Sequence, residues 1–202
     1  MIEIGGRRGE MKILLMGHPN VGKSVFFNRL TGAKVMESNY PGTTVDFMKG
    51  WMRLEGEDVE LIDVPGAFSL EPKDRAEEVA VEMLEENRDS VVVCVLDASK
   101  VERGLYLALE IIERGYPVVV ALNMWDVAED KNIKIEVEKL ERILGVPVVP
   151  TTAISGEGFK ELVSKIKEAA PVKIEKIIES ASGVNVATSA GEGGVESAAV
   201  SG

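Results

Sequence analysis

The chain has 202 residues of ordinary globular composition, a length that suits one domain with a short appendage. Its 34 acidic and 23 basic residues give a net charge of −11, which argues against nucleic acid as a partner because no local basic patch offsets it. The longest apolar runs, 91–96 and 118–122, are far short of the roughly 20 residues of a membrane helix, so we expect a soluble chain with no membrane span.

The first part of the chain contains a complete nucleotide-binding pattern. Residues 1–10 carry the run G-G-R-R-G without apolar periodicity and are predicted to form a flexible extension. A strand is predicted at 13–16 and a helix at 25–30, with Gly32 suited to its C-cap. Between them, residues 17–24 read G-H-P-N-V-G-K-S and fit G-x-x-x-x-G-K-[ST] in full. Strand before and helix after indicate a phosphate-binding loop rather than a chance match in a strand-turn-helix.

This loop offers backbone and side-chain ligands to a phosphate group. Consecutive N–H groups and the helix N-terminus point at the anion, Lys23 reaches the β- and γ-phosphates, and Ser24 binds Mg²⁺. His18 is expected to be a solvent-facing side chain and not a base. The predicted nucleotide-binding residues of the loop are Gly17, His18, Pro19, Asn20, Val21, Gly22, Lys23 and Ser24.

Residues 34–44 are polar and turn-rich, and we predict a loop there. Its Gly42, Thr43 and Thr44 are predicted to contact the nucleotide, and Thr44 is preferred to Thr43 as the residue that completes Mg²⁺ coordination. Two strands over 45–54 and 59–63, joined by a turn at 56–58, read as an antiparallel hairpin at the sheet edge.

The second strand of this hairpin ends in D-x-x-G at residues 63–66. Asp63 is expected to hold a water ligand of Mg²⁺, and the Gly66 N–H to bond the γ-phosphate, so that the following loop senses GTP against GDP. Taken alone, this motif would favour the simpler interpretation of a strand that ends in a Pro-Gly turn.

The rest of the chain alternates helices and buried strands. A helix is expected after Asp74, with Glu77 in the capping-box position. The single cysteine, Cys94, is expected to be buried inside a strand. The predicted strands lie at 91–96, 117–122 and 146–149, and the predicted helices are marked by Val79, Met83 and Leu84, by Leu105, Leu109 and Ile112, by Val137, Leu140 and Leu144, and by Phe159, Leu162, Val163 and Ile166. The alternation predicts a three-layer α/β domain of about six strands, mostly parallel with one antiparallel edge strand.

A second nucleotide motif, N-x-x-D at residues 123–126, follows the predicted strand at 117–122. A carboxylate at Asp126 accepts hydrogen bonds from the guanine N1–H and N2–H₂ groups, a pair of donors that adenine lacks. The position of the motif at a strand end, where ligands of such sheets bind, indicates a guanine-reading role for Asn123, Met124 and Asp126.

Domain boundaries follow from composition. We predict a GTPase domain over 11–170, preceded by the extension at 1–10. Residues 171–202 are predicted to form a short linker, with one or two helical turns at 172–179, and a disordered tail rich in Ser, Gly and Ala.

Taken together, the motifs resemble those of the translation-factor-like GTPases. The particular residues within the motifs resemble the cytosolic G domain of the FeoB ferrous-iron transporters. The resemblance rests on G-H-P-N-V-G-K-S at 17–24, N-Y-P-G-T-T at 39–44, D-V-P-G-A-F-S-L at 63–70 and N-M-W-D at 123–126. It implies a Ras-like P-loop GTPase fold and a last guanine-contacting loop at 150–154, where the Ala153 N–H meets guanine O6 between Thr152 and Ile154.

The resemblance also implies an activity and partners. The domain is expected to hydrolyse GTP with Mg²⁺ and to regulate Fe²⁺ uptake at the cytoplasmic side of the cell membrane. FeoB proteins continue into a helical regulatory domain and a membrane permease, so a fragment of a longer protein is suspected. The residues expected to act in hydrolysis are Lys23, Asn20, Thr44 and Gly66, and the expected Mg²⁺ ligands are Ser24, Thr44 and Asp63.

Two positions depart from the common GTPase pattern. Ala67 stands where many GTPases carry a water-orienting glutamine, and Met124 stands where N-K-x-D has a lysine. The resemblance suggests K⁺ held by Asn20 as a substitute charge. Two alternatives stay open: an Era-like ribosome-assembly GTPase, against which Met124 counts, and a slow nucleotide-dependent binding module, which Ala67 makes plausible.

Overall fold

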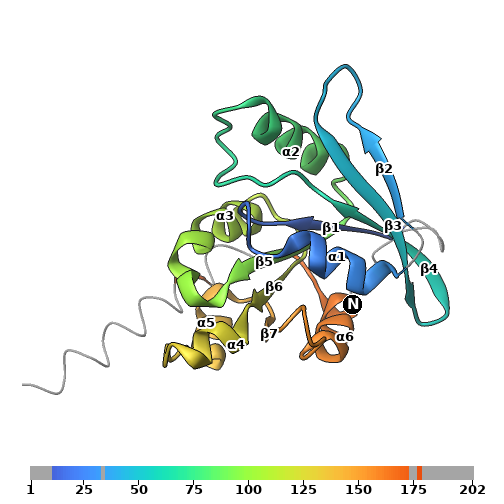
Figure 1. Ribbon diagram of the computed structural model, residues 1–202. Helices are drawn as coiled ribbons and strands as arrows, with labels where there is room; N and C mark the ends of the chain where they lie inside the picture. The colour runs from blue at the N-terminus through green and yellow to red at the C-terminus, as the bar shows by residue number, and fades with distance from the viewer. Residues whose placement is uncertain (1–10, 33–34, 173–176, 179–202) are drawn as a thin grey trace, which may run out of the picture.

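A computed structural model describes residues 11–32, 35–172 and 177–178 (Figure 1). The predicted extension at 1–10, the tail at 180–202 and most of the 172–179 segment lie outside the described residues. The strands are β1 Lys12–Met16, β2 Val35–Asn39, β3 Asp46–Leu54, β4 Glu57–Asp63, β5 Val91–Asp97, β6 Val118–Asn123 and β7 Val148–Pro150. The helices are α1 Lys23–Thr31, α2 Arg75–Glu86, α3 Val101–Glu113, α4 Trp125–Asp130, α5 Val137–Leu144 and α6 Phe159–Glu168, with a 3₁₀ turn at Ala98–Lys100.

The strands form one sheet with helices on both faces, which confirms the predicted three-layer α/β architecture. Helices α1 and α6 pack on one face, and α2, α3 and α5 pack on the other (Figure 1). Because both faces are covered, β5 and β6 read as continuous apolar runs, and every residue of 91–96 is buried. Cys94 lies within this layer as predicted, and burial raises the pKa of its thiol to about 12.

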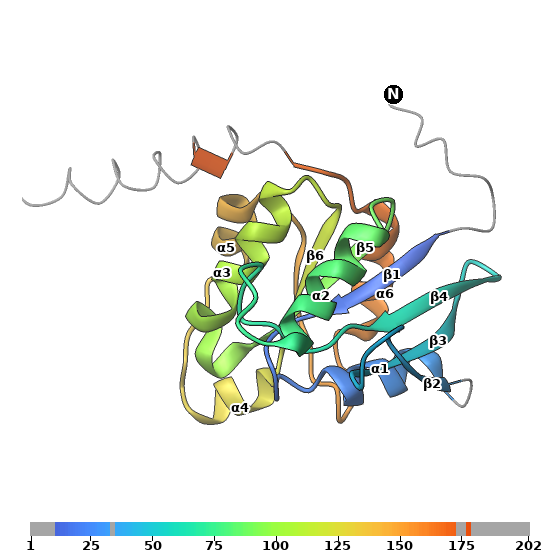
Figure 2. The ribbon, with the colours of Figure 1, turned by 90° about the horizontal axis from the view of Figure 1, so that it is seen from above.

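The sheet order is β2-β3-β4-β1-β5-β6-β7, and β1, β4, β5, β6 and β7 are mutually parallel. The predicted hairpin is present as β3 and β4, on the side of the molecule away from α4 and α5 (Figure 2). The antiparallel strand β3 is not at the edge, however, because β2 pairs with its outer side.

The prediction of a loop throughout 34–44 was therefore wrong, and the sheet has seven strands instead of about six. Residues Val35–Asn39 form β2, in which four of five side chains are exposed. Such a strand is held by its backbone ladder with β3 and has no buried face, so its sequence carries no alternation of apolar and polar residues.

Two details of the predicted helices also differ. Asp74 caps α2 through a 2.9 Å bond from the Glu77 N–H, as expected, but the Glu77 carboxylate does not return to the cap residue. The buried stripe of α3 consists of Gly104, Leu107, Ala108, Ile111 and Ile112, so the predicted Leu105 and Leu109 lie at its margin. Close packing of α3 over β5 at Gly104 rotates the helix away from the face that its leucines suggested.

The connections that leave the carboxyl ends of β1, β4, β6 and β7 gather at one edge of the sheet, and the sequence motifs lie at or after these strand ends except N-Y-P-G-T-T, which lies at the β2–β3 connection. Within the described residues, no helix has the length and apolar character needed to cross a membrane.

Candidate nucleotide site

The loop of residues 17–24 joins β1 directly to α1, and Lys23 is the first residue of that helix. No side chain caps the N-terminus of α1, so its first N–H groups are free to bind an anion. Asn20 has a left-handed backbone (φ 65°), its side chain is exposed, and no other described residue hydrogen-bonds its amide. The local backbone thus has the form expected of a phosphate-binding loop.

A cluster of Lys23, Ser24 and Asp63 lies at the base of this loop, in which Asp63 is buried, Lys23 is half-buried and Ser24 is exposed. The Ser24 hydroxyl donates a long bond of 3.4 Å to Asp63 Oδ2. Burial raises the pKa of Asp63, an effect that the Lys23 charge opposes, and burial likewise lowers the pKa of Lys23. The cluster therefore keeps a carboxylate and an ammonium partly desolvated, where each interacts strongly with an added charge.

The same cluster has the donors that Mg²⁺ prefers. Asp63 is 8% exposed, and its Oδ1 is buried without a hydrogen-bond partner. A buried carboxylate oxygen without a partner is costly unless a ligand uses it, and it lies beside a hydroxyl oxygen. These hard oxygen donors fit a magnesium ion that completes its shell with phosphate and water oxygens.

Of the two threonines before β3, Thr43 has a structural role in this conformation. Its hydroxyl donates to the Tyr40 carbonyl at 2.9 Å and accepts from the Val45 N–H at 3.1 Å. Thr44 is exposed and lines an open hollow with Gly42, Thr43 and Arg75. Among the described residues, no hydrogen bond joins Thr44 to Ser24 or Asp63, so the loop must move if Thr44 is to complete a metal site.

This loop is also fastened to helix α2. The Tyr40 hydroxyl donates to the Glu86 carboxylate at 2.7 Å, and this bond raises the pKa of Tyr40 to about 12. The contact is exposed, and its contribution to stability is therefore small.

The loop after β4 lies against the phosphate-binding loop. The Ala67 N–H donates to the Gly17 carbonyl at 3.2 Å, and a Cβ added at Gly66 would come 2.9 Å from Pro19. Glycine is thus required at 66 by the close approach of the two backbones.

The prediction that His18 faces solvent was wrong. Its ring lies 4.7 Å from that of Phe68 between centroids, its Nε2 is buried without a partner, and burial lowers its pKa. A half-buried neutral imidazole at this place joins the phosphate-binding loop to the loop that follows D-x-x-G.

Two carboxylates that sequence reasoning did not assign to the site fix the backbone of this second loop. Glu77, itself buried, accepts from the Phe68 N–H at 3.0 Å and the Lys73 N–H at 2.7 Å. Glu110 of α3 accepts from the Leu70 N–H at 2.8 Å. The only sequence signal was a glutamate in a capping position, which cannot indicate that its carboxylate turns toward a preceding loop.

The base-reading motif is joined to the phosphate-binding loop through Asn123, which is 2% exposed. Its Nδ2 donates to the Val21 carbonyl at 2.9 Å, and its Oδ1 accepts from the Ala153 N–H at 3.0 Å. The Ala153 N–H, which is expected to face guanine O6, therefore already has a protein acceptor. A contact with guanine O6 requires this N–H to be shared between Asn123 Oδ1 and the base.

The remaining residues predicted to read the base lie close to Asn123 or Ala153 in the sequence and differ in exposure. Met124 has a left-handed backbone (φ 59°) and begins α4, while Asp126 is exposed in the first turn of that helix. Thr152 is buried, whereas Ile154 is 80% exposed. The carboxylate of Asp126 is thus free to accept bonds from a base.

Comparison with known proteins places these features in a family. Residues 11–166 match the family described as ferrous iron transport protein B. The chain is 40% identical over 162 residues to an Fe(2+) transport protein A/Fe(2+) transporter FeoB fusion protein of Porphyromonas gingivalis, covering 80% of this chain and 19% of that protein. It is 38% identical over 157 residues to the Fe(2+) transporter FeoB of Escherichia coli strain K12, covering 76% and 20% respectively. The chain thus spans about a fifth of the length of these relatives.

Solved structures agree. The G domain of the T. maritima FeoB iron transporter superposes with a TM-score of 0.72 at 39% identity, covering 79% of this chain and 98% of that chain. The cytosolic domain of the same transporter in its GMPPNP form gives 0.75 at 40% identity, covering 78% and 63%. An S. thermophilus NFeoB E67A mutant bound to GDP gives 0.74 at 39%, covering 80% and 63%. The predicted P-loop GTPase fold is confirmed.

Proposed function

Because the chain belongs to the ferrous iron transport protein B family, we propose that it is a GTP-binding and GTP-hydrolysing domain that regulates Fe²⁺ uptake by a longer transporter. The observation that carries this proposal is the Asn123 side chain, whose two bonds hold the phosphate-binding loop and the base loop in one site. Family membership also decides against the Era-like alternative.

Residues of the cluster formed by Lys23, Ser24 and Asp63 bind the phosphate end of the nucleotide. Lys23 bonds the β- and γ-phosphate oxygens with a charge-assisted hydrogen bond. Ser24, Asp63 and, after loop movement, Thr44 are the residues that would hold Mg²⁺, which when bound neutralises charge on the phosphates. The Gly66 N–H bonds the γ-phosphate and thereby reports its presence to the loop held by Glu77 and Glu110.

Hydrolysis moves the γ-phosphoryl group to water: a bond from water oxygen to phosphorus forms, and the bond to the β–γ bridging oxygen breaks. Ala67 is buried and has no group that can orient water. We assign that role to backbone groups of the 39–44 loop, with Ala67 as a spectator. Asn20, whose exposed amide oxygen is free, is the residue that would hold K⁺, a cation that adds positive charge beside the phosphates.

Replacing Thr44 with alanine is expected to separate binding from hydrolysis. Thr44 makes no hydrogen bond to Lys23, Ser24 or Asp63 in this conformation, so GDP affinity should stay within about twofold, while single-turnover GTP hydrolysis should fall by roughly tenfold or more. Calorimetry with GDP and a quenched-flow assay measure the two quantities. Thr43→Ala, which removes the turn-stabilising hydroxyl, is the neighbouring comparison. Equal loss of GDP affinity in Thr44→Ala would show that this threonine is not a switch residue.

A K⁺ role predicts faster GTP turnover in K⁺ than in Na⁺ at equal ionic strength, by roughly tenfold or more. Asn20→Ala should remove this difference and leave GDP affinity unchanged, because the Asn20 side chain makes no hydrogen bond to another described residue that its loss would disturb. Phosphate release measured in the two salts tests both statements. Identical wild-type rates would assign the missing stabilisation to an external activating partner.

The slow binding-module alternative differs in one measurable quantity. With enzyme in excess over GTP, a hydrolysing domain converts all bound GTP to GDP in a single turnover, whereas a binding module retains GTP. Complete retention in K⁺ and Mg²⁺ would favour the module.

For the longer protein, we propose that residues 11–170 form the GTPase domain and that a helical regulatory domain and a membrane permease are its partners, at the cytoplasmic side of the membrane. The length of the relatives supports this proposal. Fe²⁺ uptake by cells expressing the full-length protein, with and without Lys23→Ala, is the corresponding test.

A further inference from the structure

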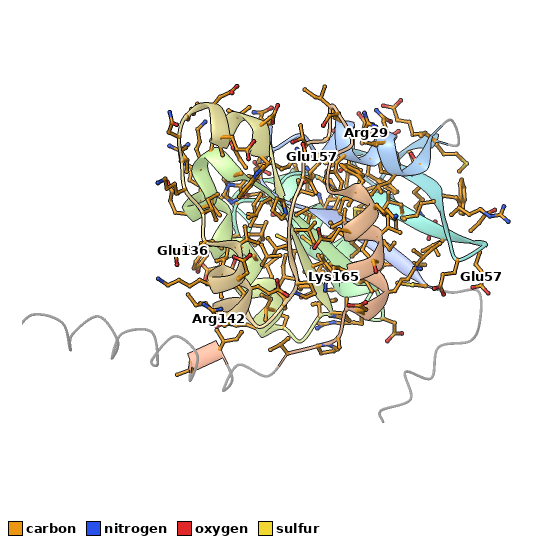
Figure 3. The ribbon with its side chains drawn as sticks, turned by 90° about the horizontal axis from the view of Figure 1, so that it is seen from below. Arg29, Glu57, Glu136, Arg142, Glu157 and Lys165 are labelled. Carbon is orange, nitrogen blue, oxygen red and sulfur yellow. The ribbon has the colours of Figure 1, made fainter. Side chains whose placement is uncertain are left out.

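Arg29, in the last turn of α1, leaves its helix to bind the loop that follows β7. Its Nε donates to the Ala153 carbonyl at 2.5 Å, and its Nη2 donates to the Ile154 carbonyl. The Arg29 Cζ also lies 6.0 Å from the centre of the Phe159 ring. Figure 3 shows Arg29 and Glu157 at the same edge of the molecule, beside this loop. One guanidinium therefore holds two successive carbonyls of the segment expected to face guanine.

The loop is shaped around this side chain. Its turn is closed by the Thr152 N–H on the Glu157 carbonyl at 3.1 Å and by the Gly156 N–H on the Thr152 carbonyl at 2.8 Å. The carbonyls of 153 and 154 take no part in that turn and face Arg29. A Cβ at Gly156 would lie 2.6 Å from Arg29 Nη1, so a larger residue there would displace the guanidinium.

Besides the turn bonds and the buried Ala153 side chain, the loop has few anchors of its own at residue 154. Ile154 is 80% exposed and contributes almost no packing. The Ala153 N–H donates to Asn123, and the Ala153 carbonyl accepts from Arg29. Both backbone polar groups of residue 153 are thus held by side chains. A guanidinium fork that donates to two neutral carbonyls gives bonds stronger than neutral ones and fixes their orientation.

We infer that Arg29 is a positioning residue for the base-binding loop and that it sets the rate at which guanine nucleotide dissociates. The inference rests on the proposed function. A bound base leaves only when the loop at 152–154 moves away, and Arg29 lowers the fraction of time in which that loop is open. Within the described residues Arg29 shares no hydrogen bond with Lys23 or Asp63, and its hydrogen bonds and ring contact are all with the base loop and Phe159, so we expect its effect at the base end.

The test is stopped-flow displacement of a fluorescent GDP analogue from the wild type, Arg29→Ala, Arg29→Lys and Arg142→Ala. Arg142 is an exposed arginine in the last turn of α5, at the opposite side of the view in Figure 3, and its variant is the matched control. Arg29→Ala is expected to raise the dissociation rate constant about tenfold and to leave the association rate constant within about twofold. Arg29→Lys, which has a single donor centre, should have a dissociation rate constant between those of the wild type and Arg29→Ala.

Two further readouts separate positioning from general destabilisation. The same rise should appear for GDP and for a non-hydrolysable GTP analogue, because the base is common to both. The single-turnover rate of GTP already bound should be unchanged within about twofold, since Arg29 does not reach the phosphates.

The outcomes are distinguishable. Arg29→Ala and Arg29→Lys that bind GDP but release it at the wild-type rate would overturn the inference and leave the proposed function standing. A wild-type chain that binds no guanine nucleotide would overturn the proposed function itself. If Arg29→Ala unfolds, Arg29→Lys decides the question, because it keeps the charge and the aliphatic stem.

Discussion

Asp126→Asn is expected to weaken GTP and GDP binding by about 100-fold or more, corresponding to ~3 kcal/mol. The exposed carboxylate of Asp126 has no competing partner within the described residues, and under the proposed function it accepts from guanine N1–H and N2–H₂. An asparagine presents one acceptor and one donor, so one of its groups opposes a guanine donor. In the wild type the same acceptor pair should make GTP bind at least ~100-fold more tightly than ATP.

Calorimetry with GDP, ADP and xanthosine diphosphate tests this assignment. Xanthine carries a carbonyl where guanine has the 2-amino group, so Asp126→Asn should gain affinity for the xanthosine nucleotide as it loses GDP. Asp130→Asn, at the other end of α4, is the control and should leave all three affinities unchanged. Equal affinity of the wild type for GTP and ATP would remove Asp126 from the base site.

Lys23→Ala is expected to reduce the affinity for both GTP and GDP by about 100-fold or more, because the charge-assisted bond to the phosphates is lost in a partly desolvated site. The fold should survive. Burial disfavours the charged form of Lys23, and the attraction of Asp63 opposes that effect, so the variant leaves the buried Asp63 carboxylate without the attraction of Lys23 and should unfold at a somewhat lower temperature.

Nucleotide affinity by calorimetry and thermal unfolding of the free protein measure the two effects separately. Lys134→Ala, in the exposed segment between α4 and α5, is the matched control for loss of one positive charge. A variant that keeps GDP affinity and loses only hydrolysis would show that Lys23 acts in the transition state alone.

These variants would also show how the two ends of the site are connected. We propose that Asp126 and Arg29 act at the base and Lys23 at the phosphates, and Asn123 joins the two loops through Val21 and Ala153. The effects of Asp126→Asn and Lys23→Ala on the rate of nucleotide dissociation should therefore not be additive in the double variant, although the two residues lie at different ends of the site. Both effects depend on the loops that Asn123 holds.

Most of the fold could be predicted because most of its elements are local and periodic. The buried strand at 91–96 is continuously apolar since both of its faces are covered, and α6 has its apolar residues at helical spacing. By contrast, β2 has no buried face and α4 has only six residues, and neither leaves a periodic signal. The face of α3 was misjudged because the close contact at Gly104, not the number of leucines, decides which side meets β5.

The sequence by itself determined the class of domain and the proposed chemistry, because phosphate and base recognition depend on short contiguous motifs whose backbone form follows from local residue type. Only the tertiary structure decided which side chains hold those motifs in place. Glu77, Glu110, Arg29 and His18 each bind a segment that is distant in sequence or turned back on itself. The chain pairs such donors and acceptors only after the strands bring their loops to one edge, and no local pattern records that pairing.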